Sequence, residues 1–247
     1  MRNGTVTPRS TPSSRGLPRF NGWSSAGRWQ GFEIVLSGRA PAAPRLSQRR
    51  QDRHQRLLAA ALALFAGQGF HETSVDQVVA AARTSKSAFY ASFGSKEHCF
   101  RVLLEQEGGQ LLAAAQEAAL RSGGDHRAKI AAGIHGFVAA CFRRAAVARL
   151  LLVESVGLAA EIETVRATLH AAFAALVEEE VRRGRAAGDF QAVDATVWSR
   201  AVVGAVNEVV GAALREGGSV DPARLAEQLG LVFGSGGRKP GERRFGS

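Results

Sequence analysis

Hydrophobic residues recur at helical spacing from residue 48 onward. In the stretch QRRQDRHQRLLAAALALFAGQGF, Leu57, Ala61 and Phe65 fall at i, i+4 and i+8, so they share one face of a helix. A basic first turn precedes this face. Gly67 and Gly69 follow it, as glycines often follow the C-terminus of a helix. The pattern predicts an amphipathic helix whose apolar stripe packs against the elements that come next.

Two shorter helices are predicted directly after it. The segment TSVDQVV combines a hydroxyl cap, a polar side chain three residues later and a pair of valines, which is typical of a capped helix start. Ser85 can cap the next helix, in which Phe89 and Phe93 stand four residues apart and point inward. Gly94 ends this helix, and Ser95 can cap a fourth one. The outward side of the third helix then carries Ser87, Ala88, Tyr90 and Ala91.

A pair of short helices joined by a tight turn is typical of a helix-turn-helix. Small outward residues let such a helix approach the floor of the DNA major groove, and hydroxyl and cationic groups at its edges can hold phosphates. Lys86 and Lys96 flank the third helix and fit this role. A helical bundle in which the serines are only caps and the lysines only solvated charges would show the same periodicity. The pattern by itself therefore leaves DNA binding and plain packing open.

Residues 105–235 are predicted to be helical throughout. The segment EIETVRATLHAAFAALVEEEVRRGRAAGDF begins with acidic and ends with basic residues, as the helix dipole favours. Asp194 can cap the next long helix, and Asp221, followed by a proline, opens a last short one. The segment VARLLLVESVGLA is very apolar and has Glu154 as its only acid. Such an acid must be paired, exposed or placed in the wall of a cavity.

The positive charge of the chain is concentrated at its N-terminus. Of the net charge of +10, residues 1–56 carry +9, because that segment has eleven arginines and only two acidic residues. Residues 1–45 are rich in Arg, Ser, Pro and Gly without any periodicity, so we expect them to be disordered. They could be a basic arm that adds affinity for nucleic acid, a transit peptide or a translated extension foreign to the native protein. Residues 236–247 are predicted to be a disordered tail.

No pattern in the sequence indicates an enzyme. The chain has no Gly-rich phosphate loop, no nucleophile elbow and no Cys/His cluster with zinc spacing, so we expect no catalytic residue, no cofactor and no metal. Cys99 and Cys141 are the only cysteines, which suits buried apolar groups in a reducing cytoplasm. No apolar run reaches the roughly 18 uncharged residues of a membrane span, so no membrane partner is expected.

The four N-terminal helices together resemble the DNA-binding domain of the TetR/AcrR family of transcriptional regulators. The similarity rests on the motifs LFAGQGF, TSVDQVV, SKSAFYASF and GSKE, which stand in this order between residues 53 and 104. It implies an all-α fold with an N-terminal three-helix helix-turn-helix DNA-binding domain over residues 48–104. A helical effector-binding and dimerisation domain would follow over residues 105–235.

The resemblance also implies which residues contact DNA. Arg83 stands where the family usually has Gly, and a left-handed conformation there would cost a non-Gly residue about 1 kcal/mol. Ala88 and Ser92 stand where Thr and His are common in the family, so readout would rely more on thymine methyl groups and DNA shape. The expected contacts to the operator and its phosphates are Thr73, Ser74, Lys86, Ser87, Ala88, Tyr90, Ser92 and Lys96.

In this family the two long late helices pack against their copies in a second subunit, and a cavity in the same domain takes a small molecule. Small residues on these helices would permit such an interface, although they would equally permit close packing within one chain. The expected cavity residues are Phe137, Cys141, Glu154, Phe173 and Trp198. The expected interface residues are Phe173, Val177, Val197, Ala201, Gly204, Ala205 and Glu208.

These observations predict a cytoplasmic, ligand-responsive transcriptional regulator that binds an inverted-repeat DNA operator as a homodimer. The favoured form is a repressor that an unidentified small molecule releases from DNA. The alternative is a helical protein-binding scaffold that retains the N-terminal motif without operator binding, and a helical enzyme is a more distant one. Because binding to phosphates weakens steeply with salt, a salt titration separates the regulator from the scaffold.

Overall fold

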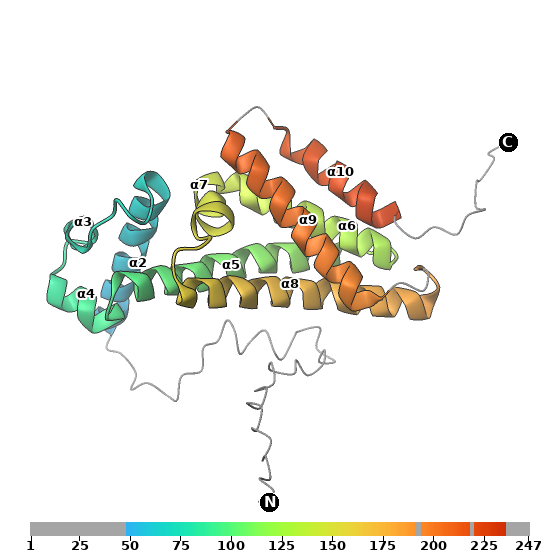
Figure 1. The fold of residues 1–247 in the computed structure, drawn as a ribbon. Coiled ribbons are helices and arrows are strands. Elements are labelled where there is room, and N and C mark those ends of the chain that lie inside the picture. The colour runs from blue at the N-terminus through green and yellow to red at the C-terminus, as the bar shows by residue number, and fades with distance from the viewer. Residues whose placement is uncertain (1–47, 191–193, 218–219, 236–247) are drawn as a thin grey trace, which may run out of the picture. The chain divides into compact units, whose positions relative to one another are not determined.

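The computed structural model describes residues 48–190, 194–217 and 220–235. Within these ranges the chain forms helices and turns and no strand, which confirms the expected all-α fold (Figure 1). The predictions for residues 1–45 and for 236–247 lie outside the described residues. The helices are α2 (Gln48–Gln68), α3 (Val75–Ala81), α4 (Lys86–Phe93), α5 (Lys96–Arg121), α6 (His126–Arg143), α7 (Ala145–Arg149), the π-helical turn η1 (Leu150–Glu154), α8 (Ala160–Ala187), α9 (Ala195–Glu216) and α10 (Pro222–Ser235).

Phenylalanine rings form the core of the N-terminal helices. The ring centroids of Phe65, Phe70 and Phe100, from α2, the loop after it and α5, lie 4.8 to 5.5 Å apart. From α4, Phe89 and Phe93 point inward and are fully buried, as their spacing predicts. Burial of each such ring contributes about 1.5–3 kcal/mol, so α2, α3, α4 and the start of α5 share one small core.

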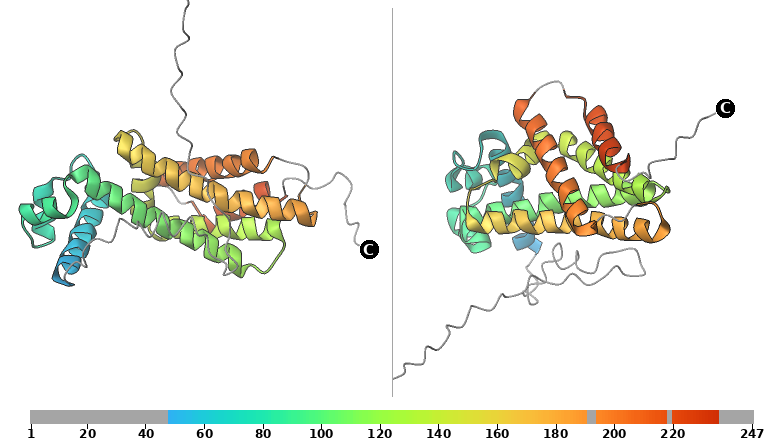
Figure 2. Two further views of the ribbon diagram at one scale, coloured as in Figure 1. Left: turned by 90° about the horizontal axis from the view of Figure 1, so that it is seen from below. Right: turned by 45° about the vertical axis from the view of Figure 1, so that its right-hand side comes forward.

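Helix α5 connects this small core to the remaining helices without a break. It runs from Lys96 to Arg121 and therefore crosses the domain boundary expected between residues 104 and 105. Helices α2, α3 and α4 lie at one end of α5, and α6 and α8 pack along the rest of it (Figures 1 and 2). A movement of α5 relative to its neighbours would thus reach the N-terminal helices directly.

Helices α5 and α6 approach each other closely at a glycine. A Cβ atom at Gly136 would lie 2.5 Å from the Cβ of Ala118 and 2.8 Å from the carbonyl oxygen of Ala114, so a larger residue would force the helices apart. Helix α10 packs on the other side of α6, and α8 packs on α9. The walls of the cavity described below come from this group of helices.

The apolar segment that contains Glu154 folds as α7 followed by η1. The backbone N–H of Ser155 donates to the carbonyl of Leu150, five residues earlier, at 3.0 Å. The buried Ser155 hydroxyl donates to the carbonyl of Leu151 at 2.6 Å. Turns with this i+5 bonding are rare and often stand at functional sites; Leu151 and Leu152 of η1 belong to the wall of the cavity described below.

Candidate DNA-binding face and effector cavity

Serine side chains set the starts of α3 and α4. The Ser74 Oγ accepts a hydrogen bond from the N–H of Gln77 at 3.2 Å, and the Gln77 Oε1 accepts one from the N–H of Ser74 at 2.8 Å, which completes a capping box. The Ser85 Oγ accepts from the N–H of Ala88 at 3.3 Å. Each cap stabilises its helix by about 1 kcal/mol. These bonds confirm the helix starts predicted from the sequence.

The turn between α3 and α4 contains an arginine with a left-handed backbone. Arg83 has a φ of 51° and is the one non-glycine residue with positive φ in the part of the chain that the structure describes. Its N–H donates to the carbonyl of Ala80 at 3.1 Å, and the N–H of Thr84 donates to the carbonyl of Val79 at 2.9 Å. The turn therefore has the geometry expected from the sequence, with a conformation that costs a residue with a Cβ about 1 kcal/mol.

The outer face of α4 presents an aromatic ring, hydroxyl groups and a lysine. Tyr90 is 50% exposed, and the exposed Ser87 has its Oγ 3.0 Å from the Oγ of Ser85. The Lys86 Nζ lies 2.7 Å from the Asp76 Oδ1, and this hydrogen bond, with the charge of Asp76, raises the pKa of Lys86. Exposed ion pairs contribute little stability, so a DNA phosphate could replace Asp76 at small cost.

Thr73 and Lys96 are used inside the domain. Thr73 is 1% exposed, and its hydroxyl donates to the carbonyl of Gly69 at 2.7 Å. The Lys96 Nζ donates to the carbonyls of Phe70 and Thr73 at 2.9 and 3.0 Å and lies 4.2 Å from the centre of the Phe70 ring. The phosphate contact expected of Thr73 is therefore corrected, because its side chain is buried. Lys96 holds the loop before α3, whose carbonyls have no helical partner.

Ala88 lies differently from the helical-wheel expectation, and Ser92 differently from the DNA contact that the family resemblance implies. Ala88 is buried, so its methyl group cannot meet a thymine methyl in this arrangement. Ser92 is partly exposed, and its hydroxyl donates to the carbonyl of Ala88 at 2.8 Å. The reason is that α4 packs on both α3 and α5, so its buried arc is wider than a single stripe.

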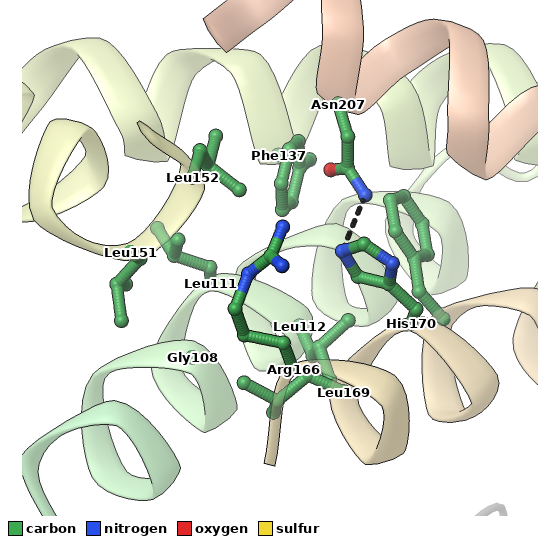
Figure 3. A pocket seen from close by; sticks show the side chains of 11 residues that line it. Gly108, Leu111, Leu112, Phe137, Leu151, Leu152, Arg166, Leu169, His170 and Asn207 are labelled. Atoms are coloured by element: carbon green, nitrogen blue, oxygen red, sulfur yellow. Dashed lines mark hydrogen bonds between the residues drawn. The ribbon is translucent and has the colours of Figure 1, made fainter. Parts of the chain in front are cut away.

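A small cavity lies between the C-terminal helices (Figure 3). Its volume is about 40 Å³, which is room for a few water molecules. The polar part of its wall consists of Arg166 and His170 from α8 and Asn207 from α9. The other residues of the wall are Gly108, Leu111, Leu112, Phe137, Leu151, Leu152, Leu169 and Phe173. They include the expected Phe137 and Phe173, whose ring centroids are 5.0 Å apart.

Arg166 extends into the cavity (Figure 3), and its Nε has no hydrogen-bond partner. Its Nη1 donates to both carboxylate oxygens of Glu163 at 2.8 and 3.0 Å. Glu163 also accepts from the N–H of Gly157 at 2.7 Å, and this bond, followed by the charge of Arg166, lowers the pKa of Glu163. The Nε of Arg166 is buried and has no hydrogen-bond partner. An unpaired buried donor on a charged group is unfavourable, so this atom favours an added acceptor.

His170 stands beside Arg166 in a neutral state. The Asn207 Nδ2 lies 3.1 Å from the His170 Nε2. Because an amide nitrogen can only donate, Nε2 is the acceptor and Nδ1 carries the ring proton. Burial, and then the positive charge of Arg166, lower the pKa of His170. Arg166 is thus the positively charged group in this wall.

Three of the expected cavity residues lie elsewhere. Cys141 is in the core between helices, where burial raises its pKa to about 12. Glu154 accepts a hydrogen bond from the Arg149 Nε at 3.0 Å and faces the N-terminal helices instead of the cavity. Trp198 packs edge-on against Phe190, with 5.5 Å between the ring centroids. None of these three side chains is among the residues of the cavity wall.

The expected interface residues divide between the core and the surface. Phe173 and Val177 are buried within the chain, so they are not available to a second subunit. On α9, Val197 is 68% exposed, and a Cβ atom at Gly204 would meet nothing within 4 Å. The other expected residues of α9 follow the same outer stripe, namely Ala201, Ala205 and Glu208.

Helix α9 carries apolar residues on its inner face as well as on its outer stripe, so it is apolar along much of its length. Of the described residues, it is the one helix long and apolar enough to cross a membrane by length and composition alone. Its inner face belongs to the packed core, with Val202, Val206 and Val210 buried. Core helices of this kind satisfy the same criterion, so the evidence for a membrane span is weak.

Two protein-family models match the chain. The model of bacterial regulatory proteins of the tetR family matches residues 57–103, which contain α3, α4 and most of α2. The model of a tetracyclin repressor-like C-terminal domain matches residues 123–236, which contain α8, α9 and the polar wall of the cavity. The chain belongs to the TetR family. As a TetR-family protein it is a transcriptional regulator and not an enzyme.

Solved structures of TetR-type regulators share the fold. The fatty acid degradation regulator FadR from Bacillus halodurans superposes with a TM-score of 0.68 at 17% identity, over 75% of this chain and 97% of that one. FadR from Bacillus subtilis in complex with stearoyl-CoA gives 0.67 at 17% identity, over 74% and 99%. PfmR from Thermus thermophilus gives 0.59 at 24% identity, over 72% and 97%. These similarities establish the fold.

A curated relative is similar in sequence over part of its length. The HTH-type transcriptional activator FasR from Mycolicibacterium smegmatis is 30% identical over 88 residues. The match spans 36% of this chain and 40% of that relative. It therefore supports DNA-binding character and leaves the effector open.

Three cavity residues of this TetR-family protein carry no expectation from the sequence, namely Arg166, His170 and Asn207. A signal for the first two was present, because Arg166, Leu169, His170 and Phe173 stand at i, i+3, i+4 and i+7. A cation on the same stripe as a buried aromatic residue indicates a polar group facing inward. Asn207 gives no such signal, since its role depends on how α9 crosses α8.

Proposed function

We propose that this TetR-family regulator is a cytoplasmic homodimeric repressor that binds an inverted-repeat DNA operator and leaves it when a small molecule enters the cavity. The observation that carries the proposal is the exposed outer face of α4 within a TetR-type helix-turn-helix. The FadR structure that holds stearoyl-CoA supports an effector role for the C-terminal domain.

The DNA contacts are made from the outer face of α4 and its edges. Tyr90 and Ser87 meet the major groove, and Lys86 exchanges Asp76 for a phosphate. Ser74, at the N-terminus of α3, lies where backbone N–H groups favour a phosphate. Ser92 and Lys96 add to this surface only if they give up the backbone carbonyls that they bind at present.

The second subunit packs on the outer stripe of α9. Val197, Ala201 and Gly204 form a stripe of small apolar residues beside the exposed Arg200, and such a stripe lets two helices approach closely. A two-fold dimer presents two α4 helices to two half-sites about one DNA turn apart. An inverted-repeat operator follows from this symmetry.

Ligand binding reaches the DNA-binding helices through η1. Leu151 and Leu152 of η1 lie in the cavity wall. Glu154, at the end of the same turn, has a carboxylate oxygen 3.9 Å from the position of a Cβ on Gly69, in the loop between α2 and α3. Because the cavity holds only a few waters, an effector must displace part of its wall. The bound state is then a different arrangement of η1, and the ligand shifts the population toward it.

Selection of genomic DNA fragments by the purified full-length protein tests the function. We expect enrichment of fragments with an inverted repeat, and affinity that falls steeply with salt. Lys86→Ala should lower the salt slope by about one unit, whereas Lys129→Ala, which removes a lysine from α6, should leave it unchanged. No enriched sequence, together with salt-insensitive binding, would favour the protein-binding scaffold.

The direction of regulation is tested separately. A reporter gene placed behind the selected operator should be silent with the regulator present and active without it. The partial relative FasR is named as an activator, and lower reporter output on deletion of the regulator would assign that role here too.

A further inference from the structure

The wall of the cavity in the effector domain combines polar and apolar side chains. Arg166 and His170 offer N–H groups (Figure 3). Leu111, Phe137 and Leu151 are among the apolar residues of the same wall. A ligand that fits this wall has an apolar body and a compact polar head.

The unpaired Nε of Arg166 decides the kind of head. The atom is buried and has no partner, while the Nη1 of the same group is already bound by Glu163. A wholly apolar ligand would leave Nε unpaired, and an ammonium head would add a second positive charge beside it. An oxygen that accepts a hydrogen bond satisfies Nε, and the Nδ1–H of His170 stands in the same wall.

We propose that the effector is an acyl compound, an apolar chain ending in a carbonyl oxygen that accepts a hydrogen bond from the Arg166 Nε. The proposal rests on the proposed function and specifies its effector. Two sources share this chemistry: a free carboxylate and a thioester of the same acyl chain. Both place an acceptor oxygen at the end of an apolar chain.

Glu163 distinguishes the two sources. It neutralises Arg166 in the absence of ligand, and it is held by the N–H of Gly157 at 2.7 Å. A ligand carboxylate competes with Glu163 for Arg166, because two anions would otherwise share one cation. A thioester carbonyl is neutral and leaves the pair in place. Glu163→Gln should therefore strengthen binding of a carboxylate several-fold and leave binding of a thioester unchanged.

Titration calorimetry on the full-length protein tests the head group without any variant. The probes are hexanoate, decanoate, palmitate, decanoyl-CoA and decylamine. We expect decanoate or decanoyl-CoA to bind at least about tenfold more tightly than decylamine, which has the same chain and no acceptor oxygen. Decylamine binding as tightly as the acyl probes, or no binding by any acyl probe, overturns the proposal.

Arg166→Gln should weaken the preferred acyl probe about tenfold or more, because the charged donor is lost. Arg182→Gln is the matched control, since Arg182 lies on the same helix and pairs with Glu178 and Glu179 on the surface. If Arg166→Gln does not fold, Arg166→Lys keeps the charge without Nε and should also weaken binding. Equal affinity for wild type and a folded Arg166 variant overturns the proposal.

Operator binding without ligand separates this proposal from the proposed function. A protein that binds its selected operator but no acyl probe is a regulator with a different effector. A protein that binds acyl probes but no DNA retains the acyl site and contradicts the proposed function.

Discussion

The helix-turn-helix and the effector helices place their polar side chains in opposite directions. On α3 and α4, Ser74 and Ser85 cap the helices, and Lys86 and Tyr90 point outward. On α8 and α9 the polar groups Arg166, His170 and Asn207 turn inward to a cavity, while small apolar residues of α9 face outward. The first arrangement is suited to a polar partner on the surface, and the second to a ligand inside and a protein partner outside.

The difference lies in which interactions hold each region. The short helices depend on local devices, because an isolated helix of seven or eight residues is marginal in water. Their caps and the left-handed turn between them add local stability to the shared phenylalanine core. The long helices α6 and α9 also carry caps, at Asp125 and Asp194, but each long helix buries a wide face against several neighbours. Their inward polar residues are fixed only by tertiary packing.

A substitution in the outer stripe of α9 is expected to change operator affinity more than any other variant discussed below. Gly204→Arg places a long charged side chain where the structure leaves open space, in the proposed contact with the second subunit. We expect a monomer by analytical ultracentrifugation, unchanged helix content, and operator affinity lower by about 100-fold or more, because only one half-site is held.

Ala223→Arg is the control for this variant, because it adds the same charge at an exposed position of α10. It should remain dimeric with normal operator affinity. A dimeric Gly204→Arg protein would place the interface on another surface.

The same contrast explains what the sequence could and could not predict. Ser85 and the inward pair Phe89 and Phe93 were predictable, because caps and the helical period are local signals. The left-handed turn at Arg83 followed from the family resemblance. The contact between His170 and Asn207 in the cavity wall was not predictable, because it depends on how α8 and α9 cross. The continuity of α5 across the boundary expected between residues 104 and 105 was not predicted either, because a continuous helix carries no break in the sequence.

Thr73 and Glu154 show that a functional role predicted from the sequence can fail. Both are polar residues in positions that suggested function from the sequence. The structure gives Thr73 a backbone carbonyl as partner and Glu154 an arginine, and neither partner can be found by counting along the chain. A polar residue near a motif therefore needs its three-dimensional partners before a role can be assigned.

Substitution of Lys96 tests whether its hydrogen bonds to the loop before α3 stabilise the DNA-binding helices. Its Nζ holds two backbone carbonyls, and a hydrogen bond to a charged donor contributes about 1.5–3 kcal/mol. We expect Lys96→Ala to lower the free energy of unfolding by about 2–3 kcal/mol in urea denaturation. Lys96→Met keeps an unbranched stem against Phe70 and should recover part of the loss. Unchanged stability, with weakened DNA binding alone, would return Lys96 to the role of a phosphate ligand.

Substitution of Tyr90 tests whether the outer face of α4 contacts DNA. Tyr90→Phe retains the ring, which lies edge-on to Phe89 with 5.5 Å between centroids, and removes only the exposed hydroxyl. We expect unchanged thermal stability and operator binding weaker by about 1–1.5 kcal/mol for one lost hydrogen bond. The measurement is an electrophoretic or anisotropy titration with the selected operator. Wild-type affinity would mean that the hydroxyl makes no contact with DNA.

Substitutions of Arg83 are expected to have the smallest effect on stability. They distinguish the contribution of the left-handed backbone from that of the side chain. Its φ of 51° is natural for glycine, so Arg83→Gly removes strain, and the added freedom of the unfolded chain offsets part of the gain. We expect a net stabilisation of up to about 1 kcal/mol by urea denaturation. Arg83→Ala keeps the strained backbone and removes the same guanidinium group, so it should show no gain. Any loss of DNA affinity common to both variants would then measure the charge of Arg83 alone. Equal stabilisation by glycine and alanine would show that the side chain, and not the left-handed backbone, is the unfavourable element of the turn.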